Sequence, residues 1–238
     1  LPTFGQKLQL EKKHRVVIGD YFKSSSEIGG DIWGFRPLSD NLISIYTIDF
    51  SGHGISAALN TFRMHAIIES IDRKTLLSPG DTLTAVNARL KDLLMTGQFA
   101  TMFYGIIDRD VNRLFYTSAA STPVMIFSKK SESQYENKLI ESNAMPVGID
   151  LDAEYKTLSV DFSTGDYLLL FSDALIETAN AQNQFFTDKD ISTIIFDDIY
   201  AKISTSKIVE NIVGRFYNFI EDRTRVTDDL TVNLYHLL

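Results

Sequence analysis

Apolar and polar residues alternate in three segments near the start of the chain, which is typical of half-buried β-strands. We predict strands over Val16–Phe22, Ile32–Pro37 and Leu42–Phe50. Segments rich in Ser, Gly, Asp and Asn, which favour turns, lie between these strands. The polar stretch 6–15 before the first strand fits the end of a helix.

The apolar spacing becomes helical after Gly54. The apolar face of this predicted helix consists of Ile55, Ala58, Leu59, Phe62, Ala66 and Ile67. A second helix should begin at Ser78, because Ser can cap it and Pro79 and Asp81 suit its first turn. Its predicted buried face consists of Leu83, Val86, Leu90, Leu93 and Leu94. We expect these helices to form an antiparallel pair inserted between strands.

Strand patterns return in the second half of the chain. The predicted strands are Met102–Asp108, Leu114–Ser118, Val124–Phe127, Tyr155–Val160, Tyr167–Phe171 and Leu230–Leu237. The polar residues 128–138 predict a long loop, Thr187 with Asp190 predicts a helix cap, and Ile208 to Ile220 predicts a longer helix. Hairpin-linked strands with grouped helices favour an α+β fold with a mainly antiparallel sheet.

The composition of the chain argues against several classes of protein. The 238 residues are 44% hydrophobic, which suits one large domain or two small ones. A net charge of -8 argues against a nucleic-acid-binding face, and the absence of Cys excludes disulfides and a thiol nucleophile. The longest apolar runs fall short of the roughly 20 residues that cross a bilayer, and the N-terminus lacks the pattern of a signal peptide.

These features predict a cytoplasmic domain without membrane insertion. Since the sequence starts with Leu, we expect a fragment of a longer protein. Residues 1–15 would be a linker or the end of an upstream helix, and residues 16–238 a single domain.

Four Asp residues lie at the ends of predicted strands. Asp49 ends one strand, Asp173 follows the apolar run 167–171, Asp228 precedes the last strand, and Asp31 follows a Gly-Gly pair. Hard cations such as Mg²⁺ and Mn²⁺ prefer oxygen ligands, so one sheet edge that gathered these side chains would form a metal site. The four together therefore point to a metal-dependent enzyme.

Each motif also has a simpler interpretation. Asp49 and Asp173 could cap helices, and the pair Asp228-Asp229 could form a turn. However, adjacent Asp residues repel each other, and a cation would relieve the repulsion. His53 could be an acid in the site or an exposed loop residue.

The motifs resemble those of the metal-dependent protein serine/threonine phosphatases (PPM, protein phosphatase 2C-like), in the bacterial branch typified by SpoIIE and RsbU. The resemblance runs from about Val16 to Leu237. The matching segments are Gly29-Gly30-Asp31, Asp49-Phe50-Ser51-Gly52-His53-Gly54 with Ala57-Ala58, Phe99 to Tyr104, Met145-Pro146-Val147-Gly148, Gly165 to Asp173 with Glu177, and Asp228-Asp229-Leu230-Thr231. Six such segments in the right order are highly specific.

The resemblance implies a four-layer α-β-β-α sandwich of two mainly antiparallel sheets flanked by helices. It also implies two divalent cations, Mn²⁺ or Mg²⁺. Asp49 would bridge both ions, the backbone carbonyl of Phe50 would bind the first, and Asp173 and Asp228 would bind the second. Asp31 would act through water. The position of the ligand in the family pattern implies that Asp228, and not Asp229, binds the second ion.

The implied activity is hydrolysis of phosphoserine or phosphothreonine by a water that the two metal ions activate. The implied substrate is a regulatory protein such as a STAS-type anti-anti-sigma factor in bacterial signalling. An upstream sensor or receiver domain, missing from this sequence, or a homodimer would regulate the domain through the helices between Ile55 and Met95.

Three departures from the family pattern leave an alternative open. Ala174 stands where a Gly usually follows the Asp, Gly34 replaces a second acidic residue, and Ala120 to Pro123 replaces Ala-Gly-His before Pro. The alternative is a weakly active or non-catalytic phosphatase-fold module that binds a regulatory partner. A third interpretation is an unrelated α/β protein whose Asp residues form turns and caps.

Overall fold

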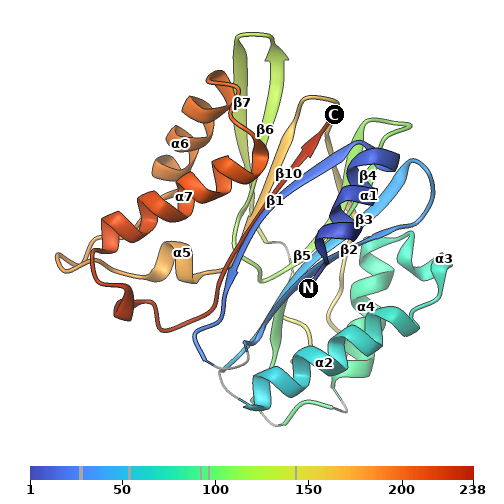
Figure 1. Cartoon of the computed structure of the whole chain (residues 1–238). Coiled ribbons are helices and arrows are strands. Elements are labelled where there is room, and N and C mark those ends of the chain that lie inside the picture. The colour runs from blue at the N-terminus through green and yellow to red at the C-terminus, as the bar shows by residue number, and fades with distance from the viewer. Residues whose placement is uncertain (27–28, 53–54, 92, 96, 143) are drawn as a thin grey trace. The chain divides into compact units, whose positions relative to one another are not determined.

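The computed structural model describes residues 1–26, 29–52, 55–91, 93–95, 97–142 and 144–238. The chain contains two five-stranded antiparallel sheets with helices (Figure 1). It divides into two compact units, each containing one sheet. The first unit comprises Leu1–His14, Ser26–Ser121 and Glu141–Ser163, and the second comprises Arg15–Ser25, Thr122–Ile140 and Thr164–Leu238.

The sheet of the first unit has the order β2-β3-β4-β5-β8. Its strands are β2 (Asp31–Pro37), β3 (Leu42–Phe50), β4 (Ala100–Asp108), β5 (Arg113–Ala119) and β8 (Leu158–Asp161). The helices of this unit are α1 (Phe4–His14), α2 (Ile55–Ser70), α3 (Arg73–Leu76) and α4 (Pro79–Leu90). Figure 1 shows α2, α3 and α4 on one side of this sheet, where α2 contacts β3 and α4 contacts β4 and β5.

The buried face of α2 differs from the predicted one. Leu59 and Phe62 are 52% and 67% exposed, while Ala57, Met64 and Ile68 are buried. The exposed residues and the buried residues are each spaced as one face of a helix. The face that contains Ala57 packs in the core of this unit. The expected face was therefore wrong at Leu59, Phe62 and Ala66, which are exposed, and is confirmed at Ile67, which is buried. The side chains of Ile55 and Ala58 lie outside those that the structure describes.

Helix α4 begins as predicted but ends earlier. The Ser78 side chain accepts a hydrogen bond from the Asp81 N–H, and Pro79 is the first residue of the helix. The helix ends at Leu90, whose carbonyl oxygen accepts hydrogen bonds from the N–H groups of Leu93 and Leu94. Because the chain turns there, Leu93 is exposed and does not continue the buried face as expected.

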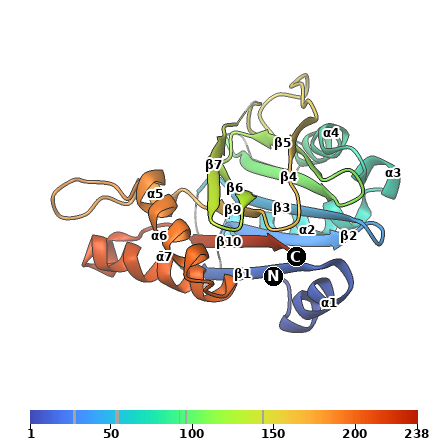
Figure 2. The same ribbon diagram turned by 90° about the horizontal axis from the view of Figure 1, so that it is seen from above.

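The sheet of the second unit has the order β1-β10-β9-β6-β7. Its strands are β1 (Val16–Lys23), β6 (Val124–Ser131), β7 (Gln134–Ile140), β9 (Tyr167–Phe171) and β10 (Leu230–Leu237). The helices are α5 (Ala174–Glu177), α6 (Asp188–Tyr200), α7 (Thr205–Ile220) and the 3-10 helix η1 (Arg223–Arg225). Helices α6 and α7 lie side by side, and α7 contacts β1 and β10 (Figure 2).

The predicted loop over residues 128–138 is wrong. Strands β6 and β7 extend through it and pair with each other almost to their shared turn. Strand β7 is polar because it lies at the edge of the sheet and is mostly exposed. Polar residues on an exposed edge strand reduce pairing with other chains, and they also hide the strand pattern.

The expected class, α+β with two mainly antiparallel sheets flanked by helices, is confirmed. The capping box formed by Thr187 and Asp190 at the start of α6 is also confirmed. Among the described residues, no helix is long and apolar enough to cross a membrane.

Candidate active site

Asp31 and Asp49 lie opposite each other in the first unit. Asp31 begins β2, Asp49 is the next-to-last residue of β3, and the two are cross-strand partners. Asp31 is buried and Asp49 is partly exposed. Side chains of directly paired residues lie on the same face, and like charges in that position are destabilising. A divalent cation would relieve this repulsion.

Backbone oxygens lie next to this pair. A methyl group added at Gly30 would lie 3.3 Å from the carbonyl oxygen of Phe50 and 3.6 Å from that of Gly52. The same methyl group would lie 3.3 Å from the Cβ of Ala57. Gly30 therefore lets the backbone beside Asp31 approach two carbonyl oxygens and α2 closely. Carboxylate and carbonyl oxygens are the ligands that Mg²⁺ and Mn²⁺ prefer.

Two hydroxyl side chains hold this region in place. The Thr61 hydroxyl on α2 lies 3.2 Å from the carbonyl oxygen of Gly30 and 3.3 Å from that of Gly29. Ser51 and Phe99 form a reciprocal pair, in which the Ser51 N–H donates to the Phe99 carbonyl and the Ser51 hydroxyl accepts from the Phe99 N–H. Ser51 belongs to the motif that begins at Asp49, whereas Thr61 lies outside all of the family motifs.

Asp173 and Asp228 line one hollow in the second unit. The hollow has a volume of about 470 Å³ and is lined by Asp173, Ala174, Glu177, Thr178, Ala179, Arg225, Thr227 and Asp228. Asp173 follows β9 by two residues, and Asp228 precedes β10 by two residues. Because β9 and β10 are antiparallel neighbours, the end of one lies beside the start of the other.

The carboxyl group of Asp173 is in an environment that disfavours its charge. Burial raises its pKa, and the nearby carboxylates of Asp228 and Glu177 raise it further. Asp173 precedes α5, but its side chain makes no capping hydrogen bond. The capping interpretation of Asp173 is therefore not supported, and the carboxylate instead faces other carboxylates, an arrangement that a cation would stabilise.

Ser172 joins the two Asp motifs of the second unit. Its hydroxyl donates to the Asp229 carbonyl and accepts from the Thr231 N–H, both at 2.8 Å. The Asp229 side chain, which is buried, accepts hydrogen bonds from the N–H and hydroxyl of Ser25. Of the two adjacent Asp residues, Asp228 lines the hollow, whereas Asp229 forms hydrogen bonds with Ser25 and Ser172.

The structure thus brings together Asp31 with Asp49, and Asp173 with Asp228. In the described part of the chain, no group of three or more His, Asp or Glu side chains is arranged to hold a metal ion. Each pair has the right donor chemistry and too few ligands alone. His53 and Gly54 lie outside the described residues.

Comparison with known proteins identifies the family. Residues 39–237 match the family described as Stage II sporulation protein E (SpoIIE). The chain belongs to the SpoIIE family. Its sequence is 27% identical to the phosphoserine phosphatase RsbP of Bacillus subtilis (strain 168) over 196 residues, and 27% identical to the phosphoserine phosphatase RsbU of the same organism over 204 residues.

These alignments cover 81% and 86% of this chain but only 47% of RsbP and 58% of RsbU. The SpoIIE-family chain therefore spans about half the length of the curated relatives it matches.

Solved structures share the fold of this SpoIIE-family chain. The SiaA-PP2C domain of Pseudomonas aeruginosa superposes with a TM-score of 0.78 at 18% identity, covering 96% of this chain and 89% of that one. A crystal structure of RsbX in complex with magnesium superposes with a TM-score of 0.65 at 18% identity, covering 94% and 96% of the two chains. The fold is thus that of a PP2C-type phosphatase domain.

The departures from the family pattern have structural consequences. The side of Gly34 that would carry a Cβ is occupied by the phenol of Tyr46, its cross-strand partner. An acidic side chain at position 34 would therefore displace Tyr46. Ala174 is buried as the first residue of α5, directly beside Asp173.

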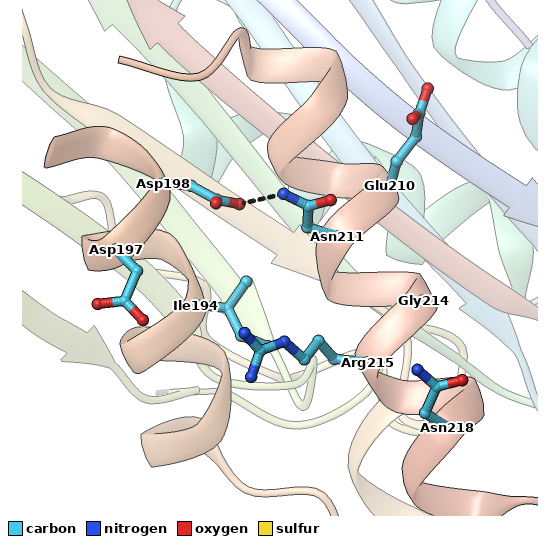
Figure 3. Close-up of a pocket in the computed structure, with 8 residues that line it drawn as sticks. All are labelled: Ile194, Asp197, Asp198, Glu210, Asn211, Gly214, Arg215 and Asn218. Carbon is cyan, nitrogen blue, oxygen red and sulfur yellow. Dashed lines mark hydrogen bonds between the residues drawn. The ribbon is translucent and has the colours of Figure 1, made fainter. Parts of the chain in front are cut away.

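A second hollow of the same unit lies between α6 and α7. It is lined by Asp197 and Asp198 on α6 and by Glu210, Asn211 and Arg215 on α7, among others. Figure 3 shows Asp198 and Asn211 pointing toward each other and Arg215 reaching toward α6. Asp198 accepts a hydrogen bond of 2.8 Å from the Asn211 side chain (Figure 3). None of the family motifs contributes to this hollow, so the hollow beside Asp173 remains the candidate site.

Proposed function

We propose that this SpoIIE-family domain is a metal-dependent protein serine/threonine phosphatase in bacterial signalling. The observation that carries the proposal is that Asp173, Glu177 and Asp228 line one hollow. Burial raises the pKa of Asp173, and the charges of Asp228 and Glu177 raise it further. Carboxylates crowded in this way are suited to a divalent cation. The pairing of Asp31 with Asp49 supports a second group of ligands.

The four Asp residues would together hold two divalent cations, Mn²⁺ or Mg²⁺. Asp49 would bridge the ions, the Phe50 carbonyl would bind the first, and Asp173 and Asp228 would bind the second. Asp31, which is buried, would act through an intervening water. When bound, such a pair of ions neutralises phosphate charge and makes a water molecule more acidic. Magnesium in the RsbX structure supports the choice of metal.

In the proposed reaction, the oxygen of water forms a bond to phosphorus while the bond to the serine oxygen breaks. The products are inorganic phosphate and a serine whose oxygen has gained a proton. A hollow of about 470 Å³ beside Asp173 has room for a phosphoseryl side chain. No covalent intermediate with the enzyme is required, in keeping with a sequence that lacks Cys.

The proposed substrate is a phosphorylated regulatory protein such as a STAS-type anti-anti-sigma factor. Two relatives bear the name phosphoserine phosphatase, which supports phosphoserine as the target. A sensor or receiver domain in a longer protein, or a second copy of the chain, would control the activity. Because α2 follows Asp49 closely and Thr61 on α2 contacts Gly30, we infer that α2 and α4 transmit this control. An unchanged rate on attachment of the upstream domain would refute that role.

The test is release of phosphate from a phosphoserine protein and from p-nitrophenyl phosphate, with added Mn²⁺ and with chelator. We expect activity only with metal, and a loss of at least about 100-fold in Asp49→Asn. Asp161→Asn is the matched control, because Asp161 is an exposed Asp at the end of β8 in the same sheet. An Asp49→Asn variant as active as Asp161→Asn would refute the proposal.

The position of Tyr46 over Gly34 favours one alternative, a phosphatase-fold module that binds a regulatory partner with little or no turnover. Stabilisation by Mn²⁺ without phosphate release from any substrate would support that alternative.

A further inference from the structure

The hollow beside Asp173 contains a positively charged group among its carboxylates. Arg225 is the only Lys or Arg among the described residues that line it. It forms no ion pair with any residue that the structure describes. Asp222, the nearest acidic residue in sequence before it, accepts hydrogen bonds from the N–H and hydroxyl of Thr224. The charge of Arg225 also lowers the pKa of Asp222, although less than the hydrogen bonds from Thr224 do, so the guanidinium lies near this exposed carboxylate without an ion pair. A ligand can therefore reach the guanidinium without breaking an ion pair.

The first and last residues of the short helix η1 are both arginines, and their side chains lie in different surroundings. Asp222 caps this helix, which runs from Arg223 to Arg225. The guanidinium carbon of Arg223 lies 4.4 Å from the centre of the Tyr217 ring, so Arg223 is engaged with α7. Arg225, two residues later, lines the hollow with Asp173 and Asp228.

We propose that Arg225 binds the phosphoryl group of the substrate and of the phosphate product. This role rests on the proposed phosphatase function and specifies how the same site recognises its substrate. A phosphate dianion that enters the hollow meets three carboxylates, Asp173, Glu177 and Asp228, and is repelled by them. A guanidinium offers planar, paired donors that match phosphate oxygens, and no existing ion pair must break first.

The charge of Arg225 has opposite effects on the two ligands of the hollow. It attracts phosphate, and it repels a divalent cation held by Asp173 and Asp228. Removal of the charge should therefore weaken phosphate binding while leaving Mn²⁺ binding equal or tighter. A purely structural role of Arg225 would weaken both.

The experiment compares the full chain with Arg225→Ala, Arg225→Lys and the control Arg223→Ala. The Michaelis constant for a phosphoserine peptide is measured at saturating Mn²⁺, together with calorimetric binding of inorganic phosphate to the Mn²⁺-loaded protein and of Mn²⁺ to the free protein. We expect Arg225→Ala to raise the Michaelis constant and the phosphate dissociation constant by about tenfold or more. Arg225→Lys should recover part of this loss, and Arg223→Ala should change either constant less than about twofold.

Three results would overturn the assignment. They are an unchanged phosphate dissociation constant in Arg225→Ala, an equal effect of Arg223→Ala, and a weakening of Mn²⁺ binding by more than about threefold. If the wild-type chain shows no turnover, the proposed function fails, and phosphate calorimetry still decides whether Arg225 is an anion-binding residue. Circular dichroism checks that each variant is folded.

Discussion

Replacement of Ser172 by Ala should weaken both the fold and the metal site. The Ser172 hydroxyl makes two hydrogen bonds, one to the Asp229 carbonyl and one from the Thr231 N–H. These bonds tie the segment before Asp173 to the segment after Asp228. Without them, the segments that carry the Asp173 and Asp228 carboxylates are held together less firmly.

The magnitude follows from the two lost bonds. Each bond contributes about 1 kcal/mol, and a buried partner left without a hydrogen bond costs about 1–3 kcal/mol. Ser172 and Thr231 are both buried, so water cannot easily replace the hydroxyl. We expect a loss of roughly 2–4 kcal/mol in the free energy of unfolding, which corresponds to a fall in Tm of roughly 4–16 °C.

The assay combines thermal unfolding with calorimetric titration of Mn²⁺, and Ser192→Ala is the matched control. Ser192 and Ser172 are both 7% exposed. The Ser192 hydroxyl also accepts one hydrogen bond, from the Asn137 side chain, and donates one, to the Asp188 carbonyl. Since it lies on α6, its loss should lower stability without changing Mn²⁺ affinity.

We expect Ser172→Ala to weaken Mn²⁺ binding by about tenfold relative to Ser192→Ala. A Ser172→Ala variant that lost stability as expected but bound Mn²⁺ as tightly as the wild type would contradict this expectation. Anchoring by Ser172 would then have no part in placing Asp173 and Asp228.

Two further predictions concern packing and pH. Gly34→Asp should lower the free energy of unfolding by about 1–3 kcal/mol, because the new side chain overlaps the Tyr46 phenol; a urea titration that shows no loss would contradict this. Burial, and to a lesser extent the charge of Lys129, lowers the pKa of His236 from 6.5 to about 4. Between these two pH values His236 is protonated in the unfolded chain and neutral in the folded chain. The free energy of unfolding should therefore fall by on the order of 2–3 kcal/mol as pH falls from 6.5 to 4. His236→Phe, which can still stack on Tyr167, should remove this dependence in urea titrations at several pH values, and an unchanged dependence would exclude His236 as its cause.

Much of the fold could be predicted because alternation and capping are local properties. The bounds of β3, β9 and β10 and the Ser78 and Thr187 caps all follow from residues close in sequence. The buried face of α2 could not be predicted in this way. Apolar residues lie on both of its faces, and only packing against the sheet selects Ala57 and Met64 over Leu59 and Phe62.

The candidate site was partly predictable for a similar reason. The positions of Asp31, Asp49, Asp173 and Asp228 at strand ends could be inferred from apolar runs that stop beside them. Their pairing depends on strand register, which the sequence does not contain. The hydroxyls of Ser172 and Thr61 act on residues about 30 to 60 positions away, so local patterns carried no sign of their roles.

The most direct test of the central claim is electron paramagnetic resonance of Mn²⁺ titrated into the chain. We expect two ions per chain with a spin-coupled spectrum, because Asp49 would bridge them and both Asp pairs would contribute ligands. Asp49→Asn should bind at most one ion, without coupling. Binding of a single uncoupled ion by the wild type, or of a coupled pair by Asp49→Asn, would contradict this claim.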